Sequence, residues 1–530
     1  MNIAAIATAP GTGGIAVIRV SGPDAFTITD TIFRARNPKR TIATAEAYTM
    51  IFGNIIDVNR QQSTDNSRDA ACCVLSVNDR NTNPNGDCRP STVDCRHNIV
   101  DEVVVAIFRA PHSFTGENTV EISCHGSIYI QQEILRLLIS AGARMAGPGE
   151  FTQRAFLNGR LDLSQAEAVA DLINAQSAAA HTIALNQMRG NFSSKLEELR
   201  RQLLHFVSLL ELELDFGDHD DLEFADRTEL NSVANEIRSQ LTRLQQTFSQ
   251  GNAIKNGIPV AIVGETNAGK STLLNLLVGD NRAIVSDIHG TTRDVIEDTV
   301  NINGLTFRFI DTAGIRQTSD IIENLGIERT YEMIERAQII LWVIDSTNVT
   351  EHIEWLAERI MRRTQGKRLI ILLNKIDRLN EEELTTLRQW FEPYCPQSRD
   401  AACCVLSVND RKTNPDGDYC PSTIDCQILE ISAKQNLNTE CLTSLLYENA
   451  QMPDLSAGDI IISNLRHYEA LTLALDSIDR VIEGLQMSIP ADFVAQDIRQ
   501  ALFHLAEITG GEITTDEVLG NIFAHFCIGK

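Results

Sequence analysis

The chain has 530 residues, a length that predicts roughly three domains. It carries 46 lysines and arginines against 71 aspartates and glutamates, a net charge of −25, so the chain as a whole is a poor nonspecific binder of nucleic acid. Any RNA that it handles would need a local basic patch or a basic partner. No run of about 18 apolar residues predicts a membrane span, and the start, MNIA, lacks the basic lead of a signal or transit peptide. We expect a cytoplasmic protein with no membrane association.

Residues 1–160 have the pattern of a mixed α/β domain. Apolar runs at 14–20 and 103–108 predict strands. Residues 128–139 predict a helix that ends near Gly142.

One segment of the sequence occurs twice. Residues 67–95 and 398–426 differ at only five positions and together hold eight of the 12 cysteines. Near-identity at such a separation indicates one inserted sequence carried twice, because structural repeats recur at a short fixed period. Turn-forming Asn-Pro and Gly residues predict that each copy loops outward at the surface. The cysteines could bind zinc, but their spacing differs between the copies, which favours a tolerated insertion.

Four stretches have the apolar spacing of helices. Apolar residues recur at three- and four-residue steps over 203–214 and 233–244. Two further helices are expected over 468–485 and 491–508. An acidic stretch, 215–223, follows the first helix; a metal site is one interpretation, and a solvated acidic loop is the one that a charge run favours.

The order of these patterns predicts three domains. The first covers 1–160 and contains the first duplicated segment. The second is helical and is built from 161–256 and 448–530. The third covers 257–447, contains the second duplicated segment, and is inserted in the helical domain.

The inserted domain opens with a phosphate-binding motif. Residues 264–271, GETNAGKS, follow an apolar run at 258–263 and precede a helical pattern that starts at Thr272. Strand, glycine loop and helix are the context that a P-loop requires, since backbone N–H groups and the helix N-terminus then face the phosphates. Lys270 would reach the terminal phosphates, and the Ser271 hydroxyl would bind Mg2+. The motif predicts a nucleoside triphosphate site.

The residues at two predicted strand ends indicate that the bound nucleotide is a guanine nucleotide. Residues 311–314, DTAG, place Asp311 where it can hold Mg2+ through water, and Gly314 lets the backbone approach the terminal phosphate. Residues 374–377, NKID, follow an apolar strand. The Asp377 carboxylate can accept hydrogen bonds from N1–H and the 2-amino group of guanine, and adenine has neither donor.

Two further stretches complete the nucleotide set. Residues 431–434, ISAK, can offer a backbone N–H to the guanine carbonyl, and residues 290–294, GTTRD, can supply a threonine to Mg2+. The second duplicated segment lies between the NKID and ISAK stretches, so it should loop outward without removing a guanine contact. The four stretches in this order predict a GTPase.

The residue after the DTAG stretch leaves the attacking water without a partner. Ras-like GTPases carry a glutamine there to orient water, whereas Ile315 cannot form a hydrogen bond. Asn267, inside the P-loop, is a candidate ligand for a monovalent cation beside the phosphates. Glu323 could orient or deprotonate the water; an exposed acid at a helix start is the alternative that spacing alone favours.

Several motifs together resemble the MnmE (TrmE) family of tRNA modification GTPases. The nucleotide-site stretches with an Asn in the P-loop match it, and the Cys-x-Gly-Lys end of the chain is specific to it. The resemblance covers essentially the whole chain except the duplicated segments. The matching stretches are 264–271, 290–294, 311–316, 526–530 (FCIGK), 111–117 (PHSFTGE), 147–156 (GPGEFTQRAF) and 158–163 (NGRLDL).

The resemblance implies a multidomain α/β and α architecture: an N-terminal α/β folate-binding and dimerisation domain, a central helical domain, and an inserted Ras-like P-loop GTPase domain with a mostly parallel sheet. It implies a potassium-activated GTPase that forms a homodimer and a heterotetramer with an MnmG-type flavoprotein, which uses FAD and NADH. The complex would add a carboxymethylaminomethyl or aminomethyl group to carbon 5 of the wobble uridine of certain tRNAs. A 5-formyl- or methylene-tetrahydrofolate would donate the one-carbon unit.

The resemblance also implies site residues. Folate contacts would be Arg19, Glu121, Arg160 and Lys530. Potassium would bind Asn267, Ser286, the Ile288 carbonyl and Thr291, while Ser271 and Thr292 would hold Mg2+. Glu323 aligns with the family's catalytic acid, and Cys527 is a candidate for a role in the modification chemistry or in packing. The residues expected at GTP are Asn267, Ala268, Gly269, Lys270, Ser271, Thr272, Ser286, Asp287, Ile288, His289, Gly290, Thr291, Thr292, Asp311, Thr312, Ala313, Gly314, Asn374, Lys375, Asp377, Ser432, Ala433 and Lys434.

Two other functions remain as alternatives. A ribosome-assembly or signalling switch would need the GTPase stretches but not the N-terminal folate stretches or the Cys-x-Gly-Lys end. A folate-binding aminomethyl transferase with a vestigial GTPase would not need the intact nucleotide set.

Overall fold

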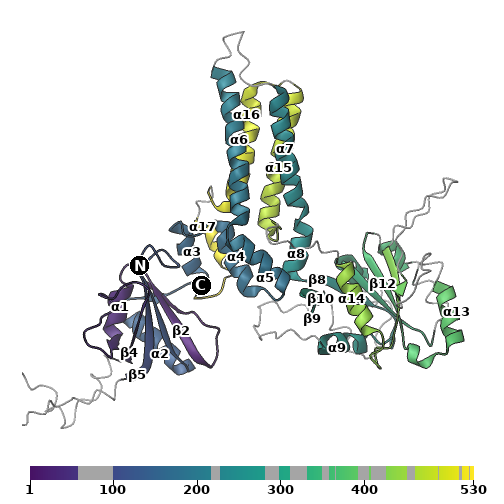
Figure 1. Cartoon of the computed structure of the whole chain (residues 1–530), viewed down its shortest axis with the longest axis horizontal. Coiled ribbons are helices and arrows are strands. Elements are labelled where there is room, and N and C mark those ends of the chain that lie inside the picture. The colour runs from purple at the N-terminus through teal and green to yellow at the C-terminus, as the bar shows by residue number, and fades with distance from the viewer. Residues whose placement is uncertain are drawn as a thin grey trace, which may run out of the picture. The chain divides into compact units, whose positions relative to one another are not determined.

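A computed structural model of the chain describes residues 1–57, 99–215, 227–280, 298–310, 331–348, 357, 359–364, 366–391, 405–406, 425–450, 460–487, 489–511, 516–524 and 526–529. The chain forms two compact units, which Figure 1 shows in one view. Unit 1 is Met1–Ala170 with Thr509–Lys530, and unit 2 is Asp171–Ile508. Among the described residues no helix is long and apolar enough to cross a membrane.

Unit 1 is built on a seven-stranded sheet of order β3-β4-β5-β6-β2-β1-β7. All neighbouring strands are antiparallel except β1 and β7. The predicted strands at 14–20 and 103–108 lie in β2 and β5, and the predicted helix at 128–139 is α2. The elements are β1 Ile3–Ile6, β2 Gly13–Ser21, α1 Ala25–Ile32, β3 Phe33–Ala35, β4 Thr49–Ile56, β5 Ile99–Phe108, β6 Thr119–Gly126, α2 Ile128–Ser140, β7 Arg144–Met145, α3 Glu150–Leu157 and α4 Leu163–Asn174.

Alternation along the strands gives this sheet one buried face. In β2, Ala16, Ile18 and Val20 are buried and join a core that includes residues of α1 and α2. The intervening side chains belong to the other face, where Ile15 is 71% exposed. Because strand side chains alternate between faces, α1 and α2 cover only one side of the sheet.

The last residues of the chain pack onto unit 1. α17, Asp516–Phe523, contributes Leu519 and Phe523 to a small core with Leu163 and Ala166 of α4. Further on, Ile528 forms a bridge with Pro148. The prediction placed residues 509–530 with the helical domain, whereas they group with unit 1; the three-domain division itself stays a prediction.

The helical part of unit 2 is a bundle whose long helices run side by side (Figure 1). α6, α7, α15 and α16 share one apolar core. All four stretches with helical spacing are confirmed as parts of these helices. The bounds are α5 Ala178–Met188, α6 Asn191–Asp215, α7 Arg227–Gln246, α8 Phe248–Asn256, α15 Leu465–Gln486 and α16 Ala491–Thr509. The acidic stretch lies outside the described residues, apart from its first residue at the end of α6.

The second sheet of unit 2 has the order β13-β14-β12-β11-β8-β10-β9. Its five central strands are parallel, and β13 and β9 pair antiparallel at the edges. A mostly parallel sheet is therefore confirmed. The elements are β8 Ile258–Val263, α9 Lys270–Asp280, β9 Asp298–Ile302, β10 Leu305–Phe309, β11 Ile339–Asp345, β12 Arg368–Asn374, η3 Ile376–Arg378, α13 Glu381–Phe391, β13 Val405–Leu406, β14 Asp425–Ile431 and α14 Thr439–Asn449.

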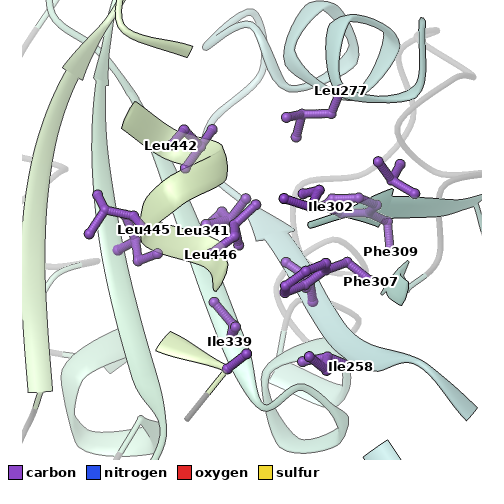
Figure 2. Close-up of a cluster of buried hydrophobic side chains, with 14 of the residues drawn as sticks. Ile258, Leu277, Ile302, Phe307, Phe309, Ile339, Leu341, Leu442, Leu445 and Leu446 are labelled. Carbon is purple, nitrogen blue, oxygen red and sulfur yellow. The ribbon is translucent and has the colours of Figure 1, made fainter. Parts of the chain in front are cut away.

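Both faces of this sheet are buried, which explains its near-continuous apolar strands. On one face, Leu341 and Phe307 pack with Leu277 of α9 and with Leu442 and Leu446 of α14, as Figure 2 shows. On the other face, residues of β11 and β12 pack with α13. Because the five central strands are parallel, their carboxyl ends meet at one edge of the sheet. Ligands bind at this edge in open α/β sheets.

Four residues of the second duplicated segment belong to this sheet. Val405 and Leu406 form β13, and Asp425 and Cys426 begin β14 and pair with the start of β12. Cys426 is 2% exposed in the sheet core. The prediction that the whole copy loops outward is wrong for these four residues, because Asp425 and Cys426 pair with the start of β12, and Val405 and Leu406 pair with β14. The rest of this copy, and the whole first copy, lie outside the described residues.

Candidate nucleotide-binding site

The P-loop connects β8 to α9, as predicted. Gly264 and Gly269 have φ values of +146° and +102°, a backbone conformation that residues with a side chain rarely adopt. A Cβ at Gly264 would lie 2.1 Å from the Val343 carbonyl oxygen, and one at Gly269 would lie 2.2 Å from Asn374 Nδ2. Both positions therefore require glycine. Asn267 also has a positive φ, +65°, and is exposed on the loop.

Lys270 begins α9 and turns back over the loop. Its ammonium donates to the carbonyl oxygens of Gly264 and Glu265, both at 2.6 Å. Burial lowers the pKa of Lys270, and the nearby Glu265 opposes that effect. A desolvated ammonium at the mouth of a phosphate loop is suited to an anionic ligand. Ser271 and Thr272 follow in the first turn of the helix.

Asn374, at the end of β12, joins three of the predicted stretches. Its side chain is buried, Nδ2 donates to the Ala268 carbonyl oxygen at 2.7 Å, and Oδ1 accepts from the Ala433 N–H at 3.0 Å. The amide thus connects the P-loop to the ISAK loop through the NKID stretch. The structure gives Asn374 a bracing role that the sequence motif alone does not reveal.

Asp377 lies beside the ISAK loop. Oδ1 accepts from the Ser432 hydroxyl at 2.6 Å, and Oδ2 accepts from Gln435 Nε2 at 3.3 Å. Each carboxylate oxygen has about two acceptor positions, so each retains capacity for a further donor. That geometry suits a base edge with two adjacent N–H donors. Gln435 was missed because no motif position distinguishes it.

Lys375 braces the neighbouring strand end. It has a positive φ of +68°, and its ammonium forms an ion pair with Asp345 at the end of β11. Burial alone would raise the pKa of Asp345, but hydrogen bonds from Lys375 and Thr347 outweigh it and leave the pKa below its ordinary value. Sequence reasoning missed Asp345, although its place at the end of an apolar strand next to β12 was a usable signal. Lys434 is exposed.

The other predicted nucleotide and metal residues lie outside the part of the chain that the structure describes. They are Ser286, Asp287, Ile288, His289, Gly290, Thr291, Thr292, Asp311, Thr312, Ala313, Gly314 and Glu323.

A second cluster lies on the partly open face of the sheet in unit 1. Arg19 contacts Glu121 Oε1 through Nε at 2.9 Å and through Nη2 at 2.8 Å. The guanidinium carbon is 5.5 Å from the ring centre of Phe114 and 5.6 Å from that of Phe151. Arg19 Nη1 also donates to the Gly529 carbonyl oxygen at 3.4 Å. The structure therefore brings Arg19 and Glu121 together with the end of the chain, and Gly529 is 510 residues from Arg19 along the sequence.

The remaining predicted residues of this cluster have defined surroundings except Lys530, which lies outside the described residues. Arg160 is exposed, and its Cγ is 3.3 Å from the position that a Cβ on Gly116 would take. The Cys527 thiol is free and exposed, and its carbonyl oxygen accepts from the Gly149 N–H at 3.3 Å. The backbone around the thiol is thus fixed while the thiol faces solvent.

Comparison with known proteins gives one consistent family. A sequence model described as GTP-binding protein TrmE N-terminus matches residues 2–160, and one described as MnmE helical domain matches residues 163–527. The chain is 51% identical to a tRNA modification GTPase MnmE of Parabacteroides distasonis, with all of both chains covered. The chain belongs to the MnmE (TrmE) family.

Two other MnmE relatives are also similar along their whole length. One from Bacteroides fragilis strain YCH46 is 49% identical, covering 100% of this chain and 99% of its own, and one from Cytophaga hutchinsonii is 44% identical, covering 100% and 98%. Membership in the MnmE family makes the chain a GTPase, and that activity in general implies GTP as the substrate and Mg2+ as the metal.

Proposed function

We propose that the chain is a potassium-activated GTPase that modifies tRNA in the cytoplasm. With an MnmG-type flavoprotein that uses FAD and NADH, it adds a carboxymethylaminomethyl or aminomethyl group to carbon 5 of the wobble uridine. The observation that carries the proposal is that one chain holds an assembled guanine-type site in unit 2 and a cationic, carboxylate and aromatic cluster at Arg19 in unit 1. Its similar relatives bear the name tRNA modification GTPase.

In unit 2 the described residues fit a guanine nucleotide with Mg2+. Lys270 and the glycine loop receive the phosphates, and Asp377, held by Ser432 and Gln435, receives the base edge. Ser271 lies in the first turn of α9, where a hydroxyl reaches the phosphate side of a P-loop, and Thr292 would be the second Mg2+ ligand. Bound Mg2+ neutralises charge on the phosphates.

Hydrolysis needs a further positive charge and a group for the water. Asn267 is exposed on the P-loop in a left-handed conformation, so its side chain is accessible to a cation beside the phosphates. Potassium there would supply the charge that an arginine finger supplies in other GTPases. Ser286, the Ile288 carbonyl and Thr291 complete the proposed cation site, and Glu323 orients or deprotonates the water.

In unit 1 the donor set at Arg19 fits a folate. The exposed Phe114 ring beside the guanidinium is suited to stack on a flat ring, and Glu121 offers a carboxylate to the aminopyrimidine edge. Arg160 and Lys530 are suited to the glutamate tail. A tetrahydrofolate, when bound, supplies the one-carbon unit. The exposed Cys527 thiol on the same unit is the proposed reactive group of the chain's end.

The open face of the unit 1 sheet supports a homodimer. Met50 and Ile15 are 69% and 71% exposed on strands β4 and β2, and Phe52 is 41% exposed. Large apolar side chains left in water on a sheet face are typical of an interaction surface. A second copy of unit 1 is the proposed occupant, and the flavoprotein joins this dimer to form a heterotetramer.

Glu323→Ala tests the catalytic part of the proposal. We expect loss of potassium-stimulated GTP hydrolysis with nearly unchanged GTP binding, because the residue acts on water and does not hold the nucleotide. Glu332→Ala, which changes an exposed acid nine residues further along the sequence, is the control and should hydrolyse GTP normally. Unchanged turnover in Glu323→Ala, or equal turnover in potassium and sodium, would contradict the assignment.

Mass spectrometry of tRNA from a deletion strain tests the modification itself. The wobble-uridine modification should disappear and return with the wild-type gene. An unchanged profile would favour the switch function, for which neither the Arg19 cluster nor the Cys-x-Gly-Lys end has a use.

A further inference from the structure

A series of charged and hydroxyl side chains lies beside the Arg19 cluster in unit 1. It starts on α3, where Arg154 Nη1 is 2.8 Å from Glu117 Oε2 and Arg154 Nη2 is 3.2 Å from Glu150 Oε1. Glu117 Oε2 also accepts from the Ser21 hydroxyl at 3.0 Å. Ser21 lies on β2 two residues after Arg19, so both side chains point to the same face of the sheet. Arg154 and Glu117 therefore connect α3 to the strand that carries Arg19.

The same series fixes the segment that carries Phe114. Ser21 Oγ is 2.8 Å from Thr115 Oγ1, and both residues are fully buried. The Glu117 N–H donates to Thr115 Oγ1 at 3.2 Å. The Thr115 carbonyl oxygen accepts from Asn158 Nδ2, just after α3, at 2.7 Å. Phe114 directly precedes Thr115 in the sequence, so the position of its ring depends on these hydrogen bonds.

The Arg154 guanidinium has its contacts with the protein. Both terminal nitrogens contact carboxylates, and the side chain is only 14% exposed. Removing one partner of a largely buried ion pair is costly, because the other charge is then left without compensation. If Arg154 influences a ligand at Arg19, it does so through Glu117 and the segment that Glu117 belongs to.

α3 supports the Arg19 cluster in two ways. The buried Phe151 ring, on α3 itself, lies 5.6 Å from the guanidinium carbon of Arg19. The exposed Phe114 ring lies 5.5 Å from the same atom, and its segment is held to α3 by Arg154 and Asn158. One helix therefore places the buried ring directly and the accessible ring through polar contacts.

A neighbouring arginine allows the role of Arg154 to be separated from a general effect on stability. Arg144 Nη1 donates to Glu150 Oε2 at 2.7 Å, so the two arginines share one carboxylate. Arg144 Nη1 also donates to the Met145 carbonyl oxygen at 3.0 Å. Neither of these acceptors belongs to the segment that carries Phe114.

We propose that Arg154 is a positioning residue of the folate site. It holds Glu117, and with it segment 113–117, so that the Phe114 ring stays beside Arg19 before the ligand arrives. A segment that is already in its bound conformation costs less free energy to order when the ligand binds. This inference rests on the proposed folate function of the Arg19 cluster and adds a residue that acts on the ligand without touching it.

The test compares Arg154→Gln with Arg144→Gln in the full chain. Both changes remove one guanidinium from Glu150, and only the first also removes the ionic partner of Glu117. Binding of 5-formyltetrahydrofolate is measured by isothermal titration calorimetry, and thermal unfolding reports on stability. Arg154→Lys keeps a cation for Glu117, and Glu117→Gln removes the same ion pair from the other side.

We expect Arg154→Gln to bind 5-formyltetrahydrofolate about tenfold more weakly than wild type, because the Phe114 segment must then be ordered on binding. Arg144→Gln should bind within about twofold of wild type, although both changes lower the unfolding temperature. Arg154→Lys should recover part of the lost affinity. The double variant Arg154→Gln/Glu117→Gln should bind no more weakly than the weaker single variant, since both changes remove one contact. If Arg154→Gln fails to fold, Glu117→Gln serves as the test and should show the same loss.

Wild-type affinity in Arg154→Gln would overturn the inference and leave the folate proposal intact. Equal losses of affinity in Arg154→Gln and Arg144→Gln would also overturn it, because a general loss of stability would then explain both. Additive losses in the double variant would show that Arg154 does not act through Glu117. Failure of the wild-type chain to bind 5-formyltetrahydrofolate would instead overturn the folate proposal, and the inference with it.

Discussion

Replacing Asn374 gives the sharpest measurement of how the nucleotide loops are held together. Its amide makes one hydrogen bond to the P-loop at Ala268 and one to the ISAK loop at Ala433. Asn374→Ala removes both bonds and leaves a buried carbonyl and a buried N–H without that partner. Asn374→Asp keeps the size and the acceptor for Ala433, but places a carboxylate oxygen against the Ala268 carbonyl.

The expected cost follows from those two bonds. A buried polar group that loses its partner costs about 1–3 kcal/mol, so Asn374→Ala should cost roughly 2–6 kcal/mol in all. Since 1.4 kcal/mol is a factor of ten, a third of the midpoint of that range, about 4 kcal/mol, would weaken GDP binding about tenfold if it were expressed in the alignment of the loops. Asn374→Asp should be at least as damaging, because it adds a repelled and desolvated charge.

GDP affinity, measured with a fluorescent analogue, and urea unfolding, followed by tryptophan fluorescence, separate binding from stability. Asn449 is a matched control: it is also buried in unit 2 and donates to Gln427 Oε1 at 2.6 Å and to the Leu445 carbonyl oxygen at 2.8 Å. Asn449→Ala should lower stability and leave GDP affinity unchanged. A GDP affinity for Asn374→Asp within threefold of wild type would refute the bracing role, since a space-filling residue would tolerate that change.

Two further predictions concern unit 1. Gly529 has a φ of +96°, and a Cβ there would lie 2.3 Å from the Ile6 carbonyl oxygen, so Gly529→Ala should detach the end of the chain and speed its digestion by carboxypeptidase. Gly142→Ala, with a φ of +112° and no atom within 4 Å, is the control; equal digestion of the two variants would count against the contact. Burial raises the pKa of Cys124 from 9.0 to about 11, so the folded thiol should stay unmodified at pH 8 while Cys527 is alkylated, as peptide mass spectrometry can show. Because the unfolded thiol ionises first, this group should lower the stability of the fold as pH rises from about 9 to about 11, and equal alkylation of both thiols would contradict the burial.

The local parts of the fold and site were predictable because each depends on a short pattern. The helix at 128–139 follows from its own spacing, and the P-loop follows from glycines that only a tight turn around phosphate requires. Asp377 and Ser432 could be assigned to one base site because the carboxyl ends of parallel strands meet at one edge.

The parts that escaped prediction depend on partners far away in the sequence. Gln435 has no local signature and acts only because the fold places it beside Asp377. Asp345 ends an apolar strand, but only the fold shows that its partner is Lys375. The same holds for the second duplicated segment: its Val405–Leu406 stretch is a strand because β14 offers an edge, although its surrounding residues have turn chemistry.

The division of unit 1 into two pieces has a consequence for how the protein is made. Residues up to Ala170 leave the ribosome first, but they must wait for about 340 residues of unit 2 before Thr509 and the segment after it can join them. At roughly 5–20 residues per second that delay is on the order of 20–70 s. During it, the surfaces of α3 and α4 that pack with α17 stay exposed on the nascent chain. Unit 2 is thus the first part able to complete its fold during translation, and unit 1 closes last.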